Sequence, residues 1–288
     1  MALAEPVHFC RNTAVPWLTN LANTLKMIIR TFNKWHLGDN LIHLNYITRA
    51  LHKNKNLEWV HYCRPEYLGD LGDLASQLER VSFMPLLECP EDAVDAWIGS
   101  NDFIWLSQKR LEWASFHIEW FSYLSKSLNI SNPIFEFSDL FFDLNSSKAI
   151  HRIDQVDVLV NNTIPLSGQV PEFNINFLNW VADELLKRGL SVVTTNPGSD
   201  AVNTQDFCYS VTEIAWLSTK AKFIIGIPNG PIWPTFNILN EHTVSARIFL
   251  ICGQVINLRN TFCYQREADF VRQVNKLILT PSEWHSNH

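Results

Sequence analysis

Short apolar segments alternate with helical patterns along this chain, and no other feature of the sequence constrains its fold as strongly. Segments rich in β-branched and aromatic residues at 27–32, 57–63 and 156–160 are each followed by a polar turn and then by apolar residues at helical spacing. A strand, a helix and a second strand in this order form a βαβ unit, which joins parallel strands. The sequence therefore predicts an α/β protein with parallel sheets.

The second half of the chain carries the clearest alternation. The predicted elements are, in order, a strand at 156–160, a helix at 173–185 stopped by Gly189, a strand at 190–195, a helix that starts at Ser210 with Glu213 at capping-box spacing, a strand at 222–227, a turn at 228–230 that opens another helix at Pro231, a strand at 246–251 and a closing helix at 270–278. This order is typical of a Rossmann-like domain.

The first half of the chain begins with the same alternation of strands and helices and then departs from it. Helices are predicted at 41–51 and 71–78, after the strands at 27–32 and 57–63. From residue 92 to 129 the pattern turns helical, most clearly from Leu111 to Leu128. A long helical stretch without a strand indicates an insertion or the flank of a domain.

The length of 288 residues fits two domains of modest size. Apolar periodicity lapses in the polar stretch 145–155 and resumes with the strand at 156. We therefore expect a boundary near residue 150, with an N-terminal α/β domain over 1–150 and a second α/β domain over 151–288.

Composition excludes several classes of function. The net charge is -6 and the basic residues are scattered, so a nucleic-acid partner is not expected. No signal-peptide pattern and no run of about 18 apolar residues occurs, which predicts a cytoplasmic protein without a transmembrane segment. The six cysteines are far apart and have no zinc-site spacing, so we interpret them as reduced thiols.

Several well-known enzyme motifs are missing. The sequence has no Gly-x-Gly-x-x-Gly, no Walker phosphate loop and no Gly-x-Ser-x-Gly. A dinucleotide oxidoreductase, a P-loop enzyme and a serine hydrolase each lose their usual signature.

Ligands of parallel α/β sheets bind beyond the carboxyl ends of the strands, and the first loop of this kind holds Gly38 and Asp39. A carboxylate there is a candidate general base. An ordinary helix N-cap is the competing interpretation of Asp39. His43 stands four residues later, but no third ligand is visible, so the sequence predicts no metal site.

Two further loops carry small polar residues. Thr163, Ser167 and Gln169 lie in the loop after the strand at 156–160 and suit phosphate oxygens, although such residues are also common in loops. Asn229, Gly230 and Pro231 precede a predicted helix, where glycine lets a ligand approach the backbone amides. This turn is the preferred pyrophosphate site, and an ordinary turn is its alternative.

Several of these segments resemble a known family. The opening blocks Met27-Ile28-Ile29-Arg30, Leu37-Gly38-Asp39-Asn40 and Thr48-Arg49-Ala50-Leu51 are similar to the start of bacterial ADP-heptose:lipopolysaccharide heptosyltransferases, which belong to the GT-B class. In the second half, Ser210–Leu217, Ala221–Gly226 and Asn229-Gly230-Pro231 follow that family's order of helix, strand and Gly-Pro turn. The resemblance covers about half of the chain, in separated blocks.

The resemblance implies two Rossmann-like domains that face each other across a cleft. Asp39 matches the family's catalytic carboxylate, and Glu213 matches the acidic residue near the nucleotide ribose, although its capping-box position explains it equally well. The implied reaction moves a sugar from a nucleotide-sugar donor to a cell-surface glycan or lipopolysaccharide precursor, with inversion and with no metal or other cofactor. Such an enzyme is cytoplasmic and peripheral to the inner membrane.

The chain also departs from the family pattern. Pro228 stands where an acidic residue is usual, and Trp233 replaces a histidine. Gln169 lies where a lysine is expected, so either Lys34, Arg30 or a helix dipole stabilises the leaving diphosphate, or turnover is poor. Two alternatives stay open: a GT-B protein that binds nucleotide sugars without catalysis, and a nucleotide-sugar epimerase or hydrolase.

Overall fold

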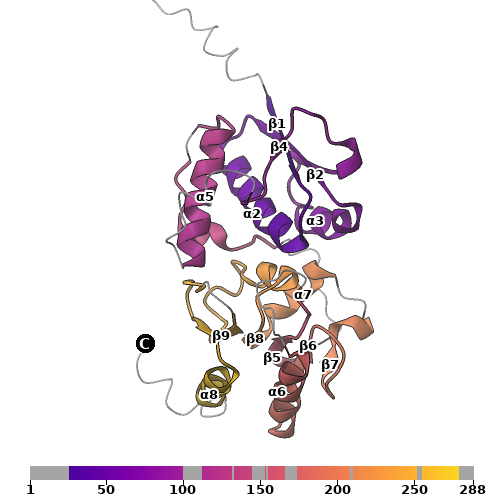
Figure 1. Ribbon diagram of the computed structural model, residues 1–288, viewed down its shortest axis with the longest axis vertical. Helices are drawn as coiled ribbons and strands as arrows, with labels where there is room; N and C mark the ends of the chain where they lie inside the picture. Colours follow the sequence, from indigo (N-terminus) through magenta and orange to yellow (C-terminus); the bar gives the residue numbers. More distant parts are fainter. Residues whose placement is uncertain are drawn as a thin grey trace, which may run out of the picture.

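The chain forms two α/β domains stacked end to end (Figure 1). The computed structural model describes residues 26–99, 112–131, 133–144, 153, 155–165, 174–207, 210–251 and 255–278. One sheet has four strands in the order β3-β2-β1-β4, and the other has six in the order β10-β9-β8-β5-β6-β7. Every strand pair within both sheets is parallel. The predicted fold class is confirmed.

The N-terminal domain is built on β1, which buries Ile29, Thr31 and Asn33 on the face that carries α2. Its elements are β1 (Met27–Asn33), α2 (Leu37–Lys53), β2 (Leu57–Cys63), η1 (Pro65–Tyr67), α3 (Leu68–Leu74), β3 (Val81–Pro85), η2 (Leu86–Glu88), β4 (Val94–Asp95), α5 (Trp113–Ser127) and η3 (Phe137–Leu140). Alternate burial along β1 is the period-2 pattern of a strand with one face on the core.

The helical pattern expected over 92–129 is wrong in its first part. Val94–Asp95 is a strand that pairs with Thr31 and Phe32, and the helix α5 begins only at Trp113. Residues 100–111 lie outside the described part of the chain. A two-residue strand is too short to show an alternation of apolar and polar residues, so periodicity does not detect it.

The C-terminal domain has a sheet whose central strands are buried on both faces, as parallel sheets require. Its elements are β5 (Val156–Asn161), α6 (Ile175–Lys187), β6 (Val192–Thr194), β7 (Val202–Asn203), η5 (Thr204–Phe207), α7 (Val211–Ser218), β8 (Ala221–Gly226), η6 (Gly230–Thr235), β9 (Ala246–Leu250), β10 (Thr261–Tyr264) and α8 (Glu267–Ile278). Gly189, with a φ of 83°, follows α6 as predicted.

The helix expected after Gly230 forms, but it is a six-residue 3₁₀ helix. Pro231 occupies its first turn and Pro234 lies inside it. Proline has no amide hydrogen to donate, so a longer α-helix gains little in this segment. The short η6 therefore has only a small dipole at its start.

Main-chain hydrogen bonds fasten the two domains together. The amide of Trp113, at the start of α5, donates to the Val255 carbonyl at 2.7 Å, and the amide of Phe142 donates to the Phe236 carbonyl at 2.7 Å. One hydrophobic core cluster includes residues of both domains.

The position of the domain boundary follows from the two sheets only in outline. The four strands of the first sheet end at Asp95, and the six strands of the second sheet begin at Val156. The boundary expected near residue 150 lies outside the described residues.

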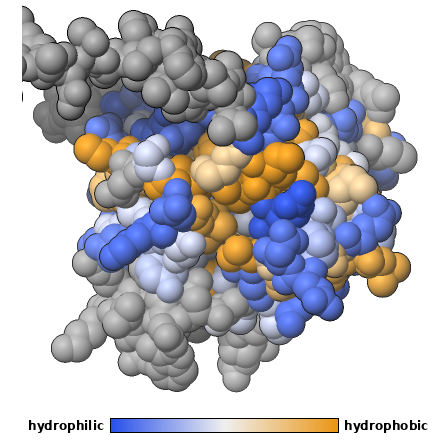
Figure 2. Space-filling model, turned by 90° about the horizontal axis from the view of Figure 1, so that it is seen from above, coloured by the Kyte–Doolittle hydropathy of each residue, from blue (hydrophilic) through white to orange (hydrophobic). Residues whose placement is uncertain are grey.

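The outer end of the N-terminal domain exposes apolar side chains. Figure 2 views the molecule from this end and shows hydrophobic surface between hydrophilic side chains. Met27 and Ile28, at the start of β1, are 39% and 47% exposed. β4 pairs only with Thr31 and Phe32, so the first half of β1 has no neighbour on that side among the described residues. No helix in the described part of the chain is long and apolar enough to span a bilayer.

Candidate functional site

Asp39 lies in the first turn of α2, directly after the carboxyl end of β1. His36 is the N-cap residue and Asp39 is the third residue of the helix, so the N-cap interpretation of Asp39 is wrong. Burial raises the pKa of the Asp39 carboxyl, while the charge of His36 and a hydrogen bond from the His36 amide lower it. A half-buried carboxylate with a raised pKa suits a general base, because its affinity for a proton is increased.

Two glycines bring the first candidate loop against the third across the domain boundary. A β-carbon on Gly38 would lie 3.2 Å from Nε1 of Trp233 and 3.4 Å from the Cα of Gly230. A β-carbon on Gly230 would lie 3.3 Å from the amide nitrogen of Gly38. A β-carbon at either position would crowd these neighbours, so glycine at both positions permits the close approach. Asp39 therefore lies next to the turn Asn229–Pro231.

The second candidate loop is tied to the same turn. The side-chain amide of Asn229 donates to the Thr163 carbonyl at 2.8 Å, and its Oδ1 accepts from Nδ2 of Asn161 at 2.8 Å. The structure thus joins Thr163 and Asn229 at the carboxyl ends of β5 and β8. Ser167 and Gln169 lie outside the described residues.

Sequence reasoning missed a buried polar cluster beneath these loops. Oγ1 of Thr195 donates to Oδ1 of Asn161 at 2.9 Å, and Asn162 accepts from the Asn196 amide at 2.7 Å. Nδ2 of Asn162 also donates to Oδ1 of Asn179 at 2.7 Å. The available signal was the position of these polar residues directly after strands that are otherwise apolar. The cluster holds the loop ends in place.

Comparison with solved structures identifies the same architecture in a known enzyme. The chain is similar to E. coli heptosyltransferase WaaC solved with ADP, at 11% identity and a TM-score of 0.52, over 87% of this chain and 97% of that one. It is also similar to WaaC solved with ADP-2-deoxy-2-fluoro heptose, at 11% identity and a TM-score of 0.51, over 87% of this chain and 99% of that one. The chain has a GT-B fold. No protein-family model matches the sequence, and no curated protein matches it.

The heptosyltransferase resemblance found in the sequence is thereby confirmed at the level of the GT-B fold, which is all that such low identity shows. In WaaC this architecture is found with a nucleotide in one structure and with a nucleotide-sugar analogue in the other. The roles of individual residues in this chain stay predictions.

Glu213 forms the capping box that its spacing predicts. Its carboxylate accepts from the Ser210 amide at 2.5 Å, and its own amide donates to Oγ of Ser210 at 3.3 Å. Asp70 of α3 reaches across from the N-terminal domain and accepts from the Val211 amide at 3.2 Å. The Glu213 carboxylate therefore has a structural partner, and its contact with a ribose stays a prediction.

The remaining charged candidates are the two basic residues that could stabilise a leaving diphosphate and the histidine four residues after Asp39. Arg30 pairs with Asp92 at 3.4 Å, and Nζ of Lys34 lies 5.7 Å from the centre of the Trp35 ring. His43 does not face outward with Asp39, because its ring is fully buried. Among the described residues, no group of three or more His, Cys, Asp or Glu side chains is placed to hold a metal ion.

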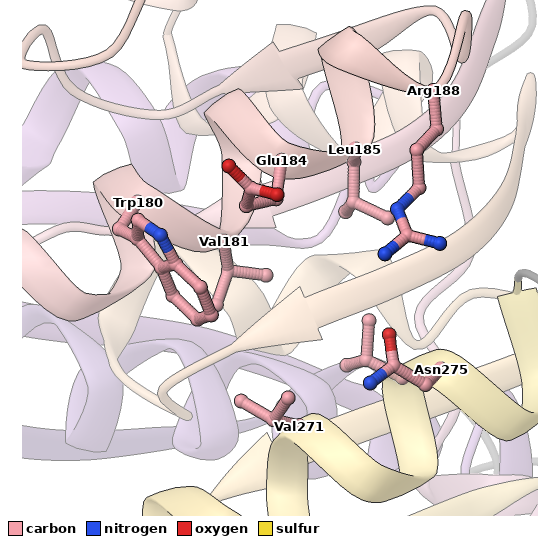
Figure 3. A pocket seen from close by; sticks show the side chains of 8 residues that line it. Trp180, Val181, Glu184, Leu185, Arg188, Val271 and Asn275 are labelled. Atoms are coloured by element: carbon pink, nitrogen blue, oxygen red, sulfur yellow. The ribbon is translucent and has the colours of Figure 1, made fainter.

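A surface hollow lies elsewhere, between α6 and α8 (Figure 3). Its lining residues are Trp180, Val181, Glu184, Leu185, Arg188, Val271, Val274 and Asn275. Arg188 directly follows α6, just before β6 begins, so the hollow lies toward the amino ends of the strands. None of the described candidate residues lines it. Ligands of such sheets bind at the carboxyl ends, so the loops around Asp39 and Gly230 stay the predicted site.

Proposed function

We propose that this chain is an inverting, metal-independent glycosyltransferase that moves a sugar from a nucleotide-sugar donor to a cell-surface glycan or lipopolysaccharide precursor. One observation carries the proposal: the loop that holds Asp39 contacts the Asn229–Pro231 turn of the other domain. With that acceptor, the enzyme works in the cytoplasm, in peripheral contact with the inner membrane.

In the proposed reaction, Asp39 accepts the proton of an acceptor hydroxyl. The hydroxyl oxygen attacks the anomeric carbon on the face opposite the nucleotide. The bond from that carbon to the phosphate oxygen breaks, and the nucleoside diphosphate leaves with the electron pair. The new glycosidic bond has inverted configuration, and the proton stays on Asp39. The raised pKa of the Asp39 carboxyl supports this role, because a stronger base makes proton transfer easier.

The donor is proposed to bind on the C-terminal domain. Asn229, Gly230 and Pro231 surround its phosphates, Glu213 lies near the ribose, and the loop with Thr163, Ser167 and Gln169 contributes hydrogen bonds. Polar groups at the carboxyl ends of parallel strands support this assignment. WaaC, solved with ADP and with a fluorinated ADP-heptose, supports a nucleoside diphosphate sugar as the class of donor.

A thermal-shift panel of nucleoside diphosphates and their sugars tests the donor class. A ligand that binds only the folded protein must raise the melting temperature. A melting temperature that does not change with any nucleotide or nucleotide sugar contradicts the proposal.

The variant Asp39→Asn tests the mechanism with the donor that this panel finds. Transfer should fall by about 10²–10⁴-fold, because the amide cannot accept the proton, while donor affinity stays within about twofold. Asp70→Asn is the matched control, since it also neutralises a partly buried carboxylate of the N-terminal domain whose pKa is raised. Full transfer by Asp39→Asn contradicts its role as the base.

A GT-B protein that binds nucleotide sugars without catalysis is the second candidate. Trp233 favours it, because it stands where the family has a histidine and its ring serves packing instead. The ring lies beside Gly38 and stacks on Trp113 with ring centres 4.6 Å apart. Its signature is a raised melting temperature with no transfer and no hydrolysis. An epimerase or hydrolase would instead alter the donor or release free nucleotide in the absence of acceptor.

A further inference from the structure

A buried chain of hydrogen bonds lies directly beneath the turn that carries Asp39. Nδ2 of Asn40 donates to the His36 carbonyl at 3.0 Å, and Oδ1 of Asn40 lies 3.0 Å from Nε2 of His61. Nδ1 of His61 lies 3.0 Å from Oγ1 of Thr31. Asn40, His61 and Thr31 are all fully buried. The chain connects β1, β2 and the start of α2.

The partners fix the direction of every bond in this chain. Because Nδ2 of Asn40 donates to a carbonyl, its Oδ1 is the acceptor, and His61 must carry its proton on Nε2. Nδ1 of His61 then accepts from the Thr31 hydroxyl. The Thr31 oxygen accepts from Nε1 of Trp59 at 2.9 Å and from Nε2 of His43 at 3.0 Å. All the donors point the same way, toward His36, and such aligned bonds strengthen one another.

His36 is the residue through which this chain reaches the candidate base. Its backbone amide and its charge both lower the pKa of the Asp39 carboxyl. The neighbouring η6, which packs beside Gly38, has the sequence GPIWPT and carries no charged side chain. The surroundings of Asp39 therefore depend on where the His36 backbone is held.

We propose that Asn40 and His61 are positioning residues, which hold the His36–Asp39 turn in the geometry that Asp39 needs to accept a proton. The inference rests on the proposed function for its kinetic consequence. Buried polar groups cost solvation energy and are replaced by apolar ones without loss where only packing matters. The side-chain nitrogen and oxygen atoms of Asn40 and His61 all have partners, and their bonds lead to this turn on one side and to Thr31 on the other. Such bonding indicates that the turn must be held accurately.

The variant Asn40→Leu tests the proposal, with Asn45→Leu as its matched control. Asn45 lies on the same helix, is 3% exposed, and donates from Nδ2 to the Asp139 carbonyl at 3.0 Å. Each variant removes one buried asparagine, so both should lower the melting temperature. Only Asn40→Leu should lower kcat, by about 10–100-fold, with KM within about twofold, because a displaced base loses its reacting geometry.

The acidic limb of the pH dependence of kcat gives a second measurement. In Asn40→Leu the His36 carbonyl keeps its 3.3 Å bond from the main-chain amide of residue 40 but loses the side-chain bond. The His36 amide and charge are then held less closely to Asp39, while burial continues to raise the pKa of its carboxyl. The limb should therefore move to higher pH in this variant and stay in place in Asn45→Leu. Equal losses of kcat in the two variants, or an unmoved limb in Asn40→Leu, overturn the positioning role.

Nuclear magnetic resonance separates this inference from the proposed function, because it needs no enzymatic activity. The ring nitrogens of His61 should show the Nε2-protonated tautomer, and the Asp39 carboxyl should titrate at higher pH in Asn40→Leu than in wild type. An Nδ1-protonated His61, or equal Asp39 titrations, overturns the positioning role even if sugar transfer is found. Absence of transfer with the expected titrations instead refutes the proposed function and leaves the held turn intact.

Discussion

His117 makes the stability of this protein depend on pH in a way that can be calculated. The ring lies in α5, is 5% exposed, and contacts the Trp113 carbonyl through Nδ1 at 2.7 Å. It also packs on Trp113 with ring centres 4.2 Å apart, where Trp113 in turn stacks on Trp233 at the domain junction. Burial lowers the pKa of His117 to about 4, so the folded protein holds a neutral ring at pH 5.

The free-energy consequence follows from the pKa of the ring in the two states. In the unfolded chain the ordinary histidine pKa is about 6.5. Below that pH the unfolded state takes up a proton that the folded state refuses, so stability falls as pH decreases, by about 1.4 kcal/mol per pH unit, until the pH approaches the folded pKa. Between pH 7 and pH 5 this amounts to about 2 kcal/mol for His117 alone.

Urea unfolding of wild type and His117→Gln at pH 7 and pH 5, followed by circular dichroism and tryptophan fluorescence, measures this difference. Glutamine retains a side-chain donor for the Trp113 carbonyl but does not titrate. Wild type should lose about 2 kcal/mol more than His117→Gln on going from pH 7 to pH 5. His242→Gln is the control, because the 64% exposed ring of His242 is solvated in both states. Equal losses in wild type and His117→Gln would refute the buried, neutral state of His117.

Two further predictions concern glycines. Gly226 has a φ of 134°, and a β-carbon there would overlap the backbone of Asn161, so Gly226→Ala should destabilise the fold by at least about 2 kcal/mol. Gly69→Ala, with nothing within 4 Å of its β-carbon in α3, should be neutral or stabilising by up to about 1 kcal/mol in the same melts.

Much of the fold was predictable from the sequence because the long elements have complete periods. The strand at 57–63 was predicted with its observed bounds, and the closing helix was found within a few residues of its start at Glu267. β4 and β7 were not predicted, because a strand of two residues is too short to show a periodic pattern of apolar residues. The kind of helix after Gly230 was missed because Pro234 acts through a lost backbone donor, which apolar spacing does not reveal.

The candidate site was predictable only in part. The sequence indicated which loops follow strands, so Asp39, Thr163 and Asn229 were found in the right kind of place. It carried no signal that Gly38 and Gly230 contact each other, because that contact depends on how two domains pack. The asparagine cluster below the loops was overlooked for a related reason: an amide after a strand is ordinary until its partners are known.

The domain junction and the candidate site are built from the same residues, and this has a mechanical consequence. Gly38 and Gly230 lie so close together that a ligand fits between them only if these turns separate. The main-chain bonds of Trp113 and Phe142 join the domains at other points of the junction. Trp233 packs beside Gly38 and stacks on Trp113 of the N-terminal domain, so a movement that parts the two glycines also has to part these rings.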